Sequence, residues 1–402
     1  MADVYFTGIT VWRATFPLRL AFSHNLASRD AAETLLATIT TSNGGVGWGQ
    51  CLPRAYLTGE SMDSAIEDIS ERWWPGLQAL SFPENADYQT LLQLFSPLFR
   101  QADAGRRNAS FAAIDVAAMD AALGAGGWRP GRGEGVTIPL VGAIPAVSPG
   151  KAAWLVRLLK WLGFRRFKVK VGRDAAADSA RIAAVRRVAA GVCRLYADAN
   201  AAWTWEEAVR RMCELRETGI ELIEEPLVRE AAANADFRRL ETMTGVATMA
   251  DESLCTLADA HSLLERGSPS RWNLRLAKNG GFSGFEALAE IARANEISCY
   301  GGILVGETGV LAAASQAAWS GTEVGCGEYG FSRIFVKGDP FRGSPAGYRG
   351  CLRTMPANRK GLGIHAVLPS LHRFGTQVWQ SSSGVVPSPE PRLRNPDGMH
   401  TV

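Results

Sequence analysis

The chain has 402 residues, of which 47% are hydrophobic and 21% charged, with a formal net charge of +3. It is too apolar to be disordered, and its charge gives no reason to expect nucleic acid or a membrane as partner. Seven cysteines without a paired spacing favour a reducing compartment over a disulfide scaffold. The first residues, MADVYFTGIT, lack the pattern of a signal peptide, so we expect a cytoplasmic protein.

The first third of the chain predicts a small α+β domain. Residues 1–50 alternate between apolar and polar side chains, which indicates antiparallel strands. Residues 61–124 follow helical patterns, with Ser61 as the expected N-cap of the first helix. The stretch 112–123 is apolar on more than one face, which predicts a buried helix. We assign residues 1–130 to this domain.

From residue 136, after a Gly-rich linker, the chain repeats a short apolar strand followed by an amphipathic helix. A polar residue lies at or near the end of six predicted strands, at spacings of 26 to 29 residues. One further apolar strand precedes this series and another follows it. Eight such strands over residues 136–345 predict an α/β fold, a closed (β/α)8 or modified TIM barrel. An open doubly wound sheet is the alternative, but no Gly-rich dinucleotide turn follows these strands. The polar residues are Lys170, Asp198, Glu224, Asp251, Lys278 and Glu307.

Three of these residues suit a metal ion. Asp198, Glu224 and Asp251 end three successive strands, and such strand ends meet at the active-site face of a barrel. Clustered carboxylates repel one another unless a cation joins them. Oxygen ligands without a nearby histidine or cysteine favour Mg²⁺, so we expect one Mg²⁺ per active site.

Lysine is scarce in this chain, and three of its lysines flank the predicted metal. Only seven of the 43 basic residues are lysines, and lysine, unlike arginine, can release its proton in a suitable environment. Lys168 and Lys170 point the same way from one strand, whereas Lys278 lies on the opposite side. This arrangement suits removal of a proton next to a carboxylate, with the metal holding the resulting enediolate. For the other four lysines, Lys151, Lys160, Lys337 and Lys360, we expect surface positions.

A single acidic residue at a strand end is more often a helix cap or a surface ion pair. A single lysine is more often a solvated surface group. Five such residues, acidic residues and lysines together, in register across five repeats favour a shared site instead.

The barrel motifs resemble those of the enolase superfamily. The similarity is to its muconate-lactonising branch, which includes cycloisomerases, o-succinylbenzoate synthases and dipeptide epimerases. The motifs that carry it are FKVKVG, YADAN, ELIEEPL, MADES, and AKNGG followed by GETG. Residues 45–64, 112–123 and 361–367 resemble that branch's capping segment, pre-barrel helix and closing segment. The resemblance implies that the N-terminal domain caps the barrel. The segment 346–402 is expected to return to the cap, with a loose tail from about residue 381.

The resemblance implies roles for individual residues. Asp198, Glu224 and Asp251 match the magnesium ligands. Glu224 is preferred over Glu225 because the ligand is the first residue of the Glu-x-Pro motif; periodicity alone does not choose between them.

The lysines and two further residues also match the family pattern. Lys170 and Lys278 match acid/base groups on opposite faces of the substrate, and Lys168 matches a supporting lysine near the substrate carboxylate. Asn200 and Glu252 lie beside ligands and are expected to support them.

The cap is expected to form a lid that selects the substrate. Candidate substrate-binding residues are His24, Arg29, Arg54 and Tyr56, each of which is as readily an ordinary loop residue. Glu307 matches the glutamate of the seventh barrel strand.

One stretch departs from the pattern. Dipeptide epimerases carry an Asp-x-Asp motif after strand eight that grips the substrate ammonium group. Here the stretch reads GTEVGCGEYGFSR, in which Glu323 and Glu328 are the candidate replacements, and its GTE is closer to the cycloisomerases.

We therefore predict a Mg²⁺-dependent isomerase that removes a proton alpha to a carboxylate. The favoured reaction is racemisation or epimerisation of an amino-acid derivative or dipeptide, with the proton passing between Lys170 and Lys278. A muconate-type cycloisomerase or an o-succinylbenzoate synthase-like dehydratase is the alternative, and a magnesium-binding barrel without turnover is a remote one. The partner is a small carboxylate, and resemblance alone implies a homo-oligomer.

Overall fold

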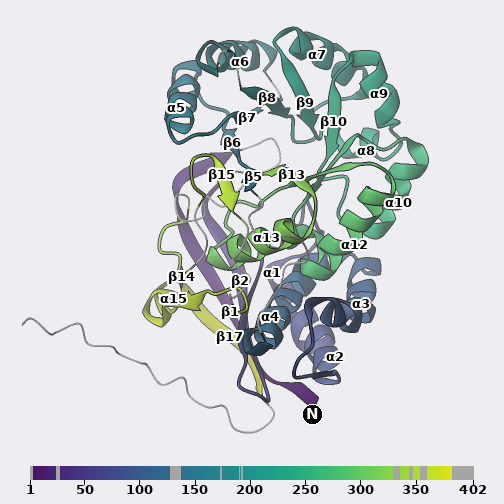
Figure 1. Ribbon diagram of the computed structural model, residues 1–402. Coiled ribbons are helices and arrows are strands. Elements are labelled where there is room, and N and C mark those ends of the chain that lie inside the picture. Colours follow the sequence, from purple (N-terminus) through teal and green to yellow (C-terminus); the bar gives the residue numbers. More distant parts are fainter. Residues whose placement is uncertain are drawn as a thin grey trace, which may run out of the picture.

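The computed structural model comprises an antiparallel sheet with helices and, beside it, a ring of parallel strands surrounded by helices (Figure 1). It describes residues 3–23, 28–126, 137–172, 174–189, 191, 193–328, 336–343, 347–353 and 360–382. None of the helices within these ranges has the length and apolar character needed to span a membrane. All seven cysteines are free, in agreement with the prediction that no disulfide scaffold exists.

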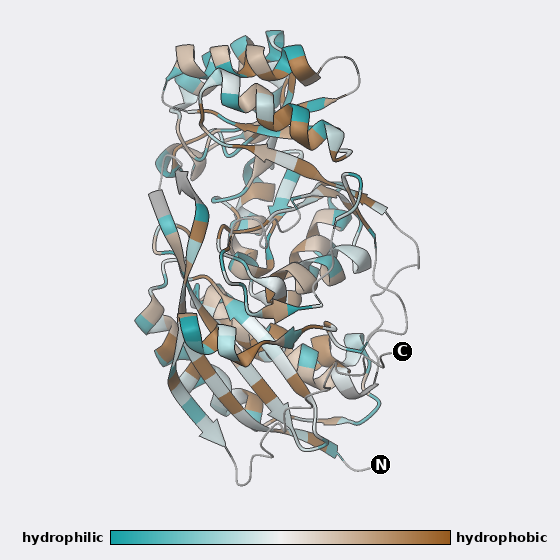
Figure 2. Ribbon diagram, turned by 90° about the vertical axis from the view of Figure 1, so that its left-hand side faces the viewer, coloured by the Kyte–Doolittle hydropathy of each residue, from teal (hydrophilic) through white to brown (hydrophobic). Residues whose placement is uncertain are grey.

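The capping sheet has the strand order β17-β1-β2-β3, and β4 pairs with the start of β1. Hydrophobic and hydrophilic residues alternate along its long strands (Figure 2), because one face packs on the helices of the cap. β17 pairs with β1, so the end of the chain completes the sheet begun by its start. Ser381 and Ser382, at the predicted start of the tail, belong to this strand, and residues from 383 onward lie outside the described ranges. The strands are β1 (Asp3–Ser23), β2 (Ser28–Thr41), β3 (Val46–Cys51), β4 (Ser81–Pro83) and β17 (Gly375–Ser382).

The helices of the cap follow the sequence signals. Ser61 caps the first helix: its hydroxyl accepts the N–H of Ser64 at 3.1 Å, and the Ser64 hydroxyl accepts the N–H of Ser61 at 3.0 Å. The fourth helix is buried on almost every side, as predicted, and it extends into the start of the expected linker. The elements are α1 (Met62–Asp68), the π-helical turn η1 (Ile69–Trp73), α2 (Trp74–Gln78), α3 (Tyr88–Ala104) and α4 (Asn108–Gly126).

Strand β3 and helix α4 meet at a seam of glycines and alanines. A Cβ at Gly49 would lie 1.8 Å from the carbonyl oxygen of Ala113, and one at Gly47 would lie 2.1 Å from that of Ala117. The same alternation extends to Gly45, just before the strand. Only glycine allows the strand to approach the helix this closely.

The barrel has eight parallel strands in sequential order, and a bridge between Leu140 and Gly327 brings its two edges together. This is the predicted (β/α)8 architecture. The strands are β6 (Val141–Ile144), β7 (Arg166–Lys170), β8 (Arg194–Asp198), β9 (Ile220–Glu224), β10 (Ala247–Ala250), β11 (Arg271–Leu274), β12 (Ser298–Gly301) and β13 (Val324–Gly327). The helices are α5 (Pro149–Trp161), α6 (Ala175–Ala189), α7 (Trp205–Glu217), α8 (Arg229–Ala232), α9 (Phe237–Thr244), α10 (Leu257–Arg266), α11 (Leu276–Asn279), α12 (Gly281–Ala294) and α13 (Gly309–Gly321).

Two of the predicted strand ends are wrong. β11 ends at Leu274, and Lys278 lies in the single helical turn α11, which Gly280 ends with a φ of 86°. β12 ends six residues before Glu307, which lies in the loop leading to α13. In both cases the strand is followed by a buried helical turn or loop whose residues are also apolar. The apolar pattern therefore predicts a longer strand than the structure has.

Short segments join the barrel to the cap. β5 (Thr137–Pro139) pairs with β15 (Cys351–Arg353). Near the end of the chain, β14 (Phe341–Arg342) pairs with β16 (His365–Ala366), and α15 (Leu368–Phe374) precedes β17.

Buried polar side chains fasten the cap to the barrel. Asp115 of α4 accepts the N–H groups of Phe282 at 2.6 Å and Ser283 at 3.3 Å, at the start of barrel helix α12. The Gln50 amide oxygen, in β3, accepts the Thr308 N–H at 2.8 Å at the start of α13. The cap therefore holds the loops at the C-terminal face of the barrel.

Candidate active site

Three buried carboxylates lie at the C-terminal ends of neighbouring barrel strands. Asp198 is the last residue of β8 and is paired in register with Glu224, the last residue of β9. Asp251 directly follows β10. Each of the three residues is no more than 1% exposed. The repeat therefore places them side by side, as expected.

Two cations bridge these carboxylates in pairs. Lys168 contacts Glu224 directly and lies 3.6 Å from Asp198. Arg275 lies 3.1 Å from Glu224 and also contacts Asp251. Each pair of carboxylates thus shares one positively charged side chain. This shared cation offsets the free-energy cost of burying the two negative charges.

Arg275 was missed by the sequence reasoning. It directly follows β11, the position that the strand–helix repeat marks on the other strands, and it begins the turn that carries Lys278. The scarcity of lysine points to Lys278, whereas Arg275 is the residue that follows the strand. The signal was present in the repeat.

The remaining two lysines contact the outer carboxylates from either side. Lys170 Nζ lies 2.7 Å from Asp198, and Lys278 Nζ lies 2.9 Å from Asp251 Oδ1. Lys278 is fully buried and also donates to the carbonyl oxygen of Leu254 at 2.9 Å. Lys168 and Lys170 point to the same carboxylate, as their spacing predicts.

The direction of the pKa shift differs among the charged groups of this site. Burial alone would lower the pKa of Lys168, but Glu224, Glu328 and Asp198 together raise it well above its ordinary value. Burial and the charge of Asp198 raise the pKa of Glu224. Although burial raises it, the ammonium groups of Lys170 and Lys168 bring the pKa of Asp198 below its ordinary value. Lys168 is therefore a fixed cation in this structure.

The geometry separates Glu224 from its neighbour. Glu224 faces the cluster, where its Oε1 also accepts a hydrogen bond from Asn273 at 2.7 Å. Glu225 turns away and accepts the backbone N–H groups of Asp251 at 2.7 Å and Ser253 at 3.2 Å. The second glutamate thus holds the loop that carries Asp251.

Asn200 and Glu252 form a chain behind Lys170. The Asn200 side-chain oxygen accepts from Lys170, and its amide group donates to Glu252 at 3.2 Å. The Asn200 backbone N–H donates to Asp198 at 3.0 Å. Burial, followed by the charges of Asp251 and other acidic neighbours, raises the pKa of Glu252 to about 8.

The two glutamates of the eighth repeat lie at opposite ends of β13. Glu323 precedes the strand and is exposed, so it lies at the far end of the barrel from the carboxylates. Glu328 follows the strand, is 8% exposed and lies 2.7 Å from Lys168. Only Glu328 of these two therefore reaches the site.

The candidate residues of the cap have different outcomes. The Arg54 guanidinium donates to the carbonyl oxygens of Pro53 at 2.9 Å and Glu33 at 3.2 Å, which holds the loop together. Tyr56 is half-buried and packs against the core. His24 and the side chain of Arg29 lie outside the described residues.

Glu307 is buried near the site although it follows no strand directly. Its Oε1 accepts the Leu304 N–H at 2.8 Å, and its Oε2 has no hydrogen-bond partner. Burial raises its pKa to about 8, an effect that the charge of Arg275 opposes.

The donor set fits Mg²⁺ in its chemistry. All three candidate ligands are carboxylates, and each of them has a positively charged side chain as its partner in this structure. The side chains of Lys168 and Arg275 lie between the carboxylates. Within the described ranges, no group of three Asp, Glu, His or Cys side chains is therefore close enough together to hold one ion. Arg275 is the shared cation of Glu224 and Asp251, so an ion held by both carboxylates would compete with this arginine for them.

Comparison with known proteins gives the family. The family described as "Enolase C-terminal domain-like" matches residues 152–367. The L-Ala-D/L-Glu epimerase of Bacillus subtilis is 31% identical over 366 residues, which cover 88% of this chain and 94% of that protein. A chloromuconate cycloisomerase of Cupriavidus pinatubonensis is 36% identical over 154 residues, or 38% of this chain and 41% of that protein.

A solved structure extends the likeness to three dimensions. The substrate-liganded complex of the Bacillus subtilis epimerase superposes with a TM-score of 0.80 at 28% identity, covering 90% of this chain and 99% of that one. These matches cover both the cap and the barrel. This chain therefore belongs to the enolase superfamily, in the branch of dipeptide epimerases and muconate cycloisomerases, and it is an isomerase.

Proposed function

We propose that this protein epimerises or racemises a small carboxylate, a dipeptide or another amino-acid derivative, by Mg²⁺-dependent 1,1-proton transfer. The observation that carries the proposal is the placement of Lys170 and Lys278, which contact the two outer carboxylates from opposite sides. The sequence likeness to the Bacillus subtilis epimerase covers 88% of this chain, whereas the sequence likeness to the chloromuconate cycloisomerase covers 38% of it, and this difference supports the same reaction.

The metal would be held by Asp198, Glu224 and Asp251. Bound there, Mg²⁺ would neutralise the substrate carboxylate and the negative charge that develops when the neighbouring proton leaves. Asn273 keeps the Glu224 carboxylate oriented, and Glu225 keeps the loop of Asp251 in place.

The lysines then divide the remaining work. In one direction Lys170 removes the proton from one face of the substrate carbon, and Lys278 delivers a proton to the other face. In the reverse direction they exchange roles, so the configuration inverts without a net change in atoms. Lys168, which is ion-paired with Glu224 and Glu328, would place its ammonium group beside the substrate carboxylate.

Glu328 is the group we assign to the nitrogen end of the substrate. It lies at the C-terminal end of β13 with its carboxylate on Lys168. A substrate ammonium or amide N–H that reached this carboxylate would receive a charge-assisted hydrogen bond.

Proton exchange in D₂O tests the proposal. The separate stereoisomers of dipeptides and N-acyl amino acids are each incubated with enzyme and Mg²⁺ in D₂O, and deuterium at the α-carbon is measured by mass spectrometry. Lys170→Ala and Lys278→Ala should each abolish exchange into one stereoisomer at the first turnover. Lys151→Ala, at an exposed lysine of α5, is the matched control and should exchange like the parent.

A cycloisomerase is the second candidate, favoured by the GTE stretch before β13 and by the partial relative. If the library shows no exchange while a muconate-type diacid is converted to its lactone, the epimerase proposal is wrong.

A further inference from the structure

Three charged side chains are buried together next to the end of β7, the strand that carries Lys168 and Lys170. They are Asp178 and Arg181 of α6 and Arg211 of α7, and each is no more than 6% exposed. The Asp178 carboxylate accepts a hydrogen bond from Arg181 at 2.9 Å and another from Arg211 at 3.1 Å. We call these three residues the α6–α7 cluster. Burial of charge is costly unless every donor and acceptor is engaged, so the further partners of the cluster show what it holds.

The Arg181 guanidinium binds two loops at the C-terminal face of the barrel. Its Nη1 donates to the carbonyl oxygen of Lys170 at 2.7 Å, and its Nε donates to the carbonyl oxygen of Val147 at 2.9 Å. Val147 lies between β6 and α5, so Arg181 ties this loop to the last residue of β7. One rigid planar group thus fixes the strand end from which the Lys170 side chain reaches Asp198.

The other members of the cluster hold the turn that follows Lys170. The Asp178 carboxylate also accepts the N–H of Gly172 at 2.8 Å. The Arg211 guanidinium lies 5.7 Å from the centre of the Trp203 ring, and the Trp203 indole N–H donates to the carbonyl oxygen of Gly172 at 3.0 Å. Gly172 is therefore held at both its N–H and its carbonyl group, two residues beyond the lysine.

Different groups hold Lys278. Its Nζ donates to the carbonyl oxygen of Leu254 at 2.9 Å, and the side-chain amide of Asn279 donates to the carbonyl oxygens of Leu254 at 3.1 Å and Cys255 at 3.2 Å. In the part of the chain that the structure describes, the hydrogen bonds of the α6–α7 cluster therefore reach Lys170 and not Lys278.

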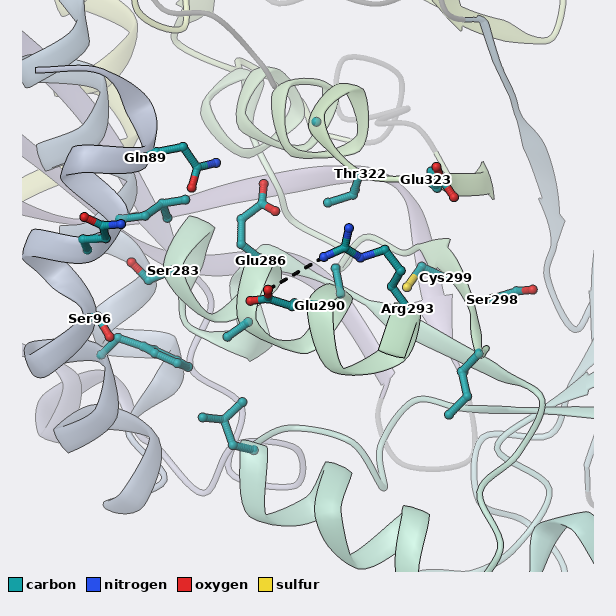
Figure 3. Close-up of a pocket in the computed structure, with 18 of the residues that line it drawn as sticks. Gln89, Ser96, Ser283, Glu286, Glu290, Arg293, Ser298, Cys299, Thr322 and Glu323 are labelled. Carbon is teal, nitrogen blue, oxygen red and sulfur yellow. Dashed lines mark ion pairs between the residues drawn. The ribbon is translucent and has the colours of Figure 1, made fainter. Parts of the chain in front are cut away.

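The groove between α3 and α12 contains an arginine–carboxylate pair of the same spacing, far from the site. The groove encloses about 960 Å³. Figure 3 shows Glu290 and Arg293 in this hollow, and their carboxylate and guanidinium groups lie 3.7 Å apart. The groove reaches Ser298, the first residue of β12, whereas Lys170 is the last residue of its strand. This pair can therefore be broken without a change at the carboxylate cluster.

We propose that Arg181, oriented by Asp178, is a positioning residue for Lys170 and controls how fast the enzyme acts on one stereoisomer of its substrate. The inference rests on the proposed function, in which Lys170 and Lys278 each remove the proton from one stereoisomer. A base must lie within hydrogen-bond reach of its proton, and a misplacement of about 1 Å can cost about 100-fold in rate. Loss of the Arg181 contacts releases the backbone of Lys170 but not that of Lys278, so one stereoisomer should be affected selectively.

Proton loss from the separate stereoisomers in D₂O tests the proposal. Arg181→Met retains a long side chain but has no donor, and it should slow proton loss by about tenfold or more from the stereoisomer that Lys170→Ala no longer deprotonates. Loss from the other stereoisomer should stay at the parent rate. Arg181→Lys cannot reach all three acceptors of the arginine at once, and it should show the same selectivity to a smaller degree. Arg293→Met, in the groove, is the matched control and should leave both rates unchanged.

A second measurement needs no substrate. Lysine labelled with ¹³C at Cε gives one NMR signal for each of the seven lysines, and Lys170→Ala and Lys278→Ala assign two of these signals. In Arg181→Met the Lys170 signal should shift or broaden, whereas the Lys278 signal should stay in place. Circular dichroism verifies that each variant is folded, and Arg181→Lys serves for both measurements if Arg181→Met does not fold.

The outcomes separate this inference from the function on which it rests. Equal slowing of both stereoisomers, or of neither, would overturn the positioning role of Arg181. An unmoved Lys170 signal in the folded variant would overturn it as well. A parent protein that exchanges no substrate would contradict the proposed function instead, and the NMR signals would still decide whether Arg181 positions Lys170.

Discussion

Substitution of Gly49 by alanine should destabilise the whole protein, because the strand touches the helix through this residue. The added Cβ would lie 1.8 Å from the Ala113 carbonyl oxygen, while ordinary contact begins at 3.4 Å. Strand and helix would have to separate by 3.4 − 1.8 = 1.6 Å. The helix cannot move freely, since Asp120 of α4 accepts the Trp48 N–H at 3.0 Å and Asp115 is bonded to the barrel.

The expected cost follows from this lack of freedom. Overpacking a well-filled core by one methyl group costs about 1–3 kcal/mol, and we expect Gly49→Ala to reach about 3 kcal/mol. Urea unfolding at 25 °C, followed by circular dichroism, measures the midpoint. Gly150→Ala is the matched control, because a Cβ at this position in the first turn of α5 meets no atom within 4 Å. If the midpoint of Gly49→Ala differs from the parent no more than that of the control, the packing argument is refuted.

Three further predictions concern buried charge. Burial raises the pKa of Asp115 to about 7, so the folded state keeps a proton that the unfolded chain releases near pH 4, and stability should fall as pH rises between these values. Asp115→Asn should flatten this dependence, which urea midpoints at pH 5 and 8 would reveal; an unchanged dependence would contradict it. Arg275→Gln should tighten Mg²⁺ binding in calorimetry while it lowers the melting temperature of the metal-free protein, because two buried carboxylates lose their shared cation. Chelation should abolish proton exchange yet leave the circular dichroism spectrum intact, since Lys168 and Arg275 already bridge the carboxylates; loss of the spectrum would show that the fold depends on the metal.

The sequence was sufficient for much of the barrel because its repeat is regular. Spacings of 26 to 29 residues place Asp198 and Glu224 at the ends of adjacent strands, where the structure also has them. The repeat was less informative where a strand ends in a buried helical turn. Lys278 lies in such a turn. The residues before and within the turn are equally apolar, so the sequence does not indicate where the strand ends and the helix begins.

The hydrogen-bond partners of individual side chains in the site could not be predicted from residue spacing. The prediction that Arg54 contacts substrate stays a prediction, and the sequence does not reveal that its guanidinium binds the carbonyl oxygens of Pro53 and Glu33. Glu323 and Glu328 are five residues apart and equally acidic, and only the strand between them separates the solvent end from the site end. Distinctions of this kind depend on three-dimensional packing, which a period along the chain does not contain.

The pairing of β17 with β1 has a consequence for biosynthesis. During translation the residues of the first strand emerge more than 360 residues before their partners in β17, so this strand edge stays open until β17 has been made. An open strand edge is a template for pairing with other molecules, and a nascent protein of this design depends on protection until release. A premature stop codon between Gly327, where the last barrel strand ends, and Gly375 would therefore yield a product that keeps all eight barrel strands but aggregates through the cap.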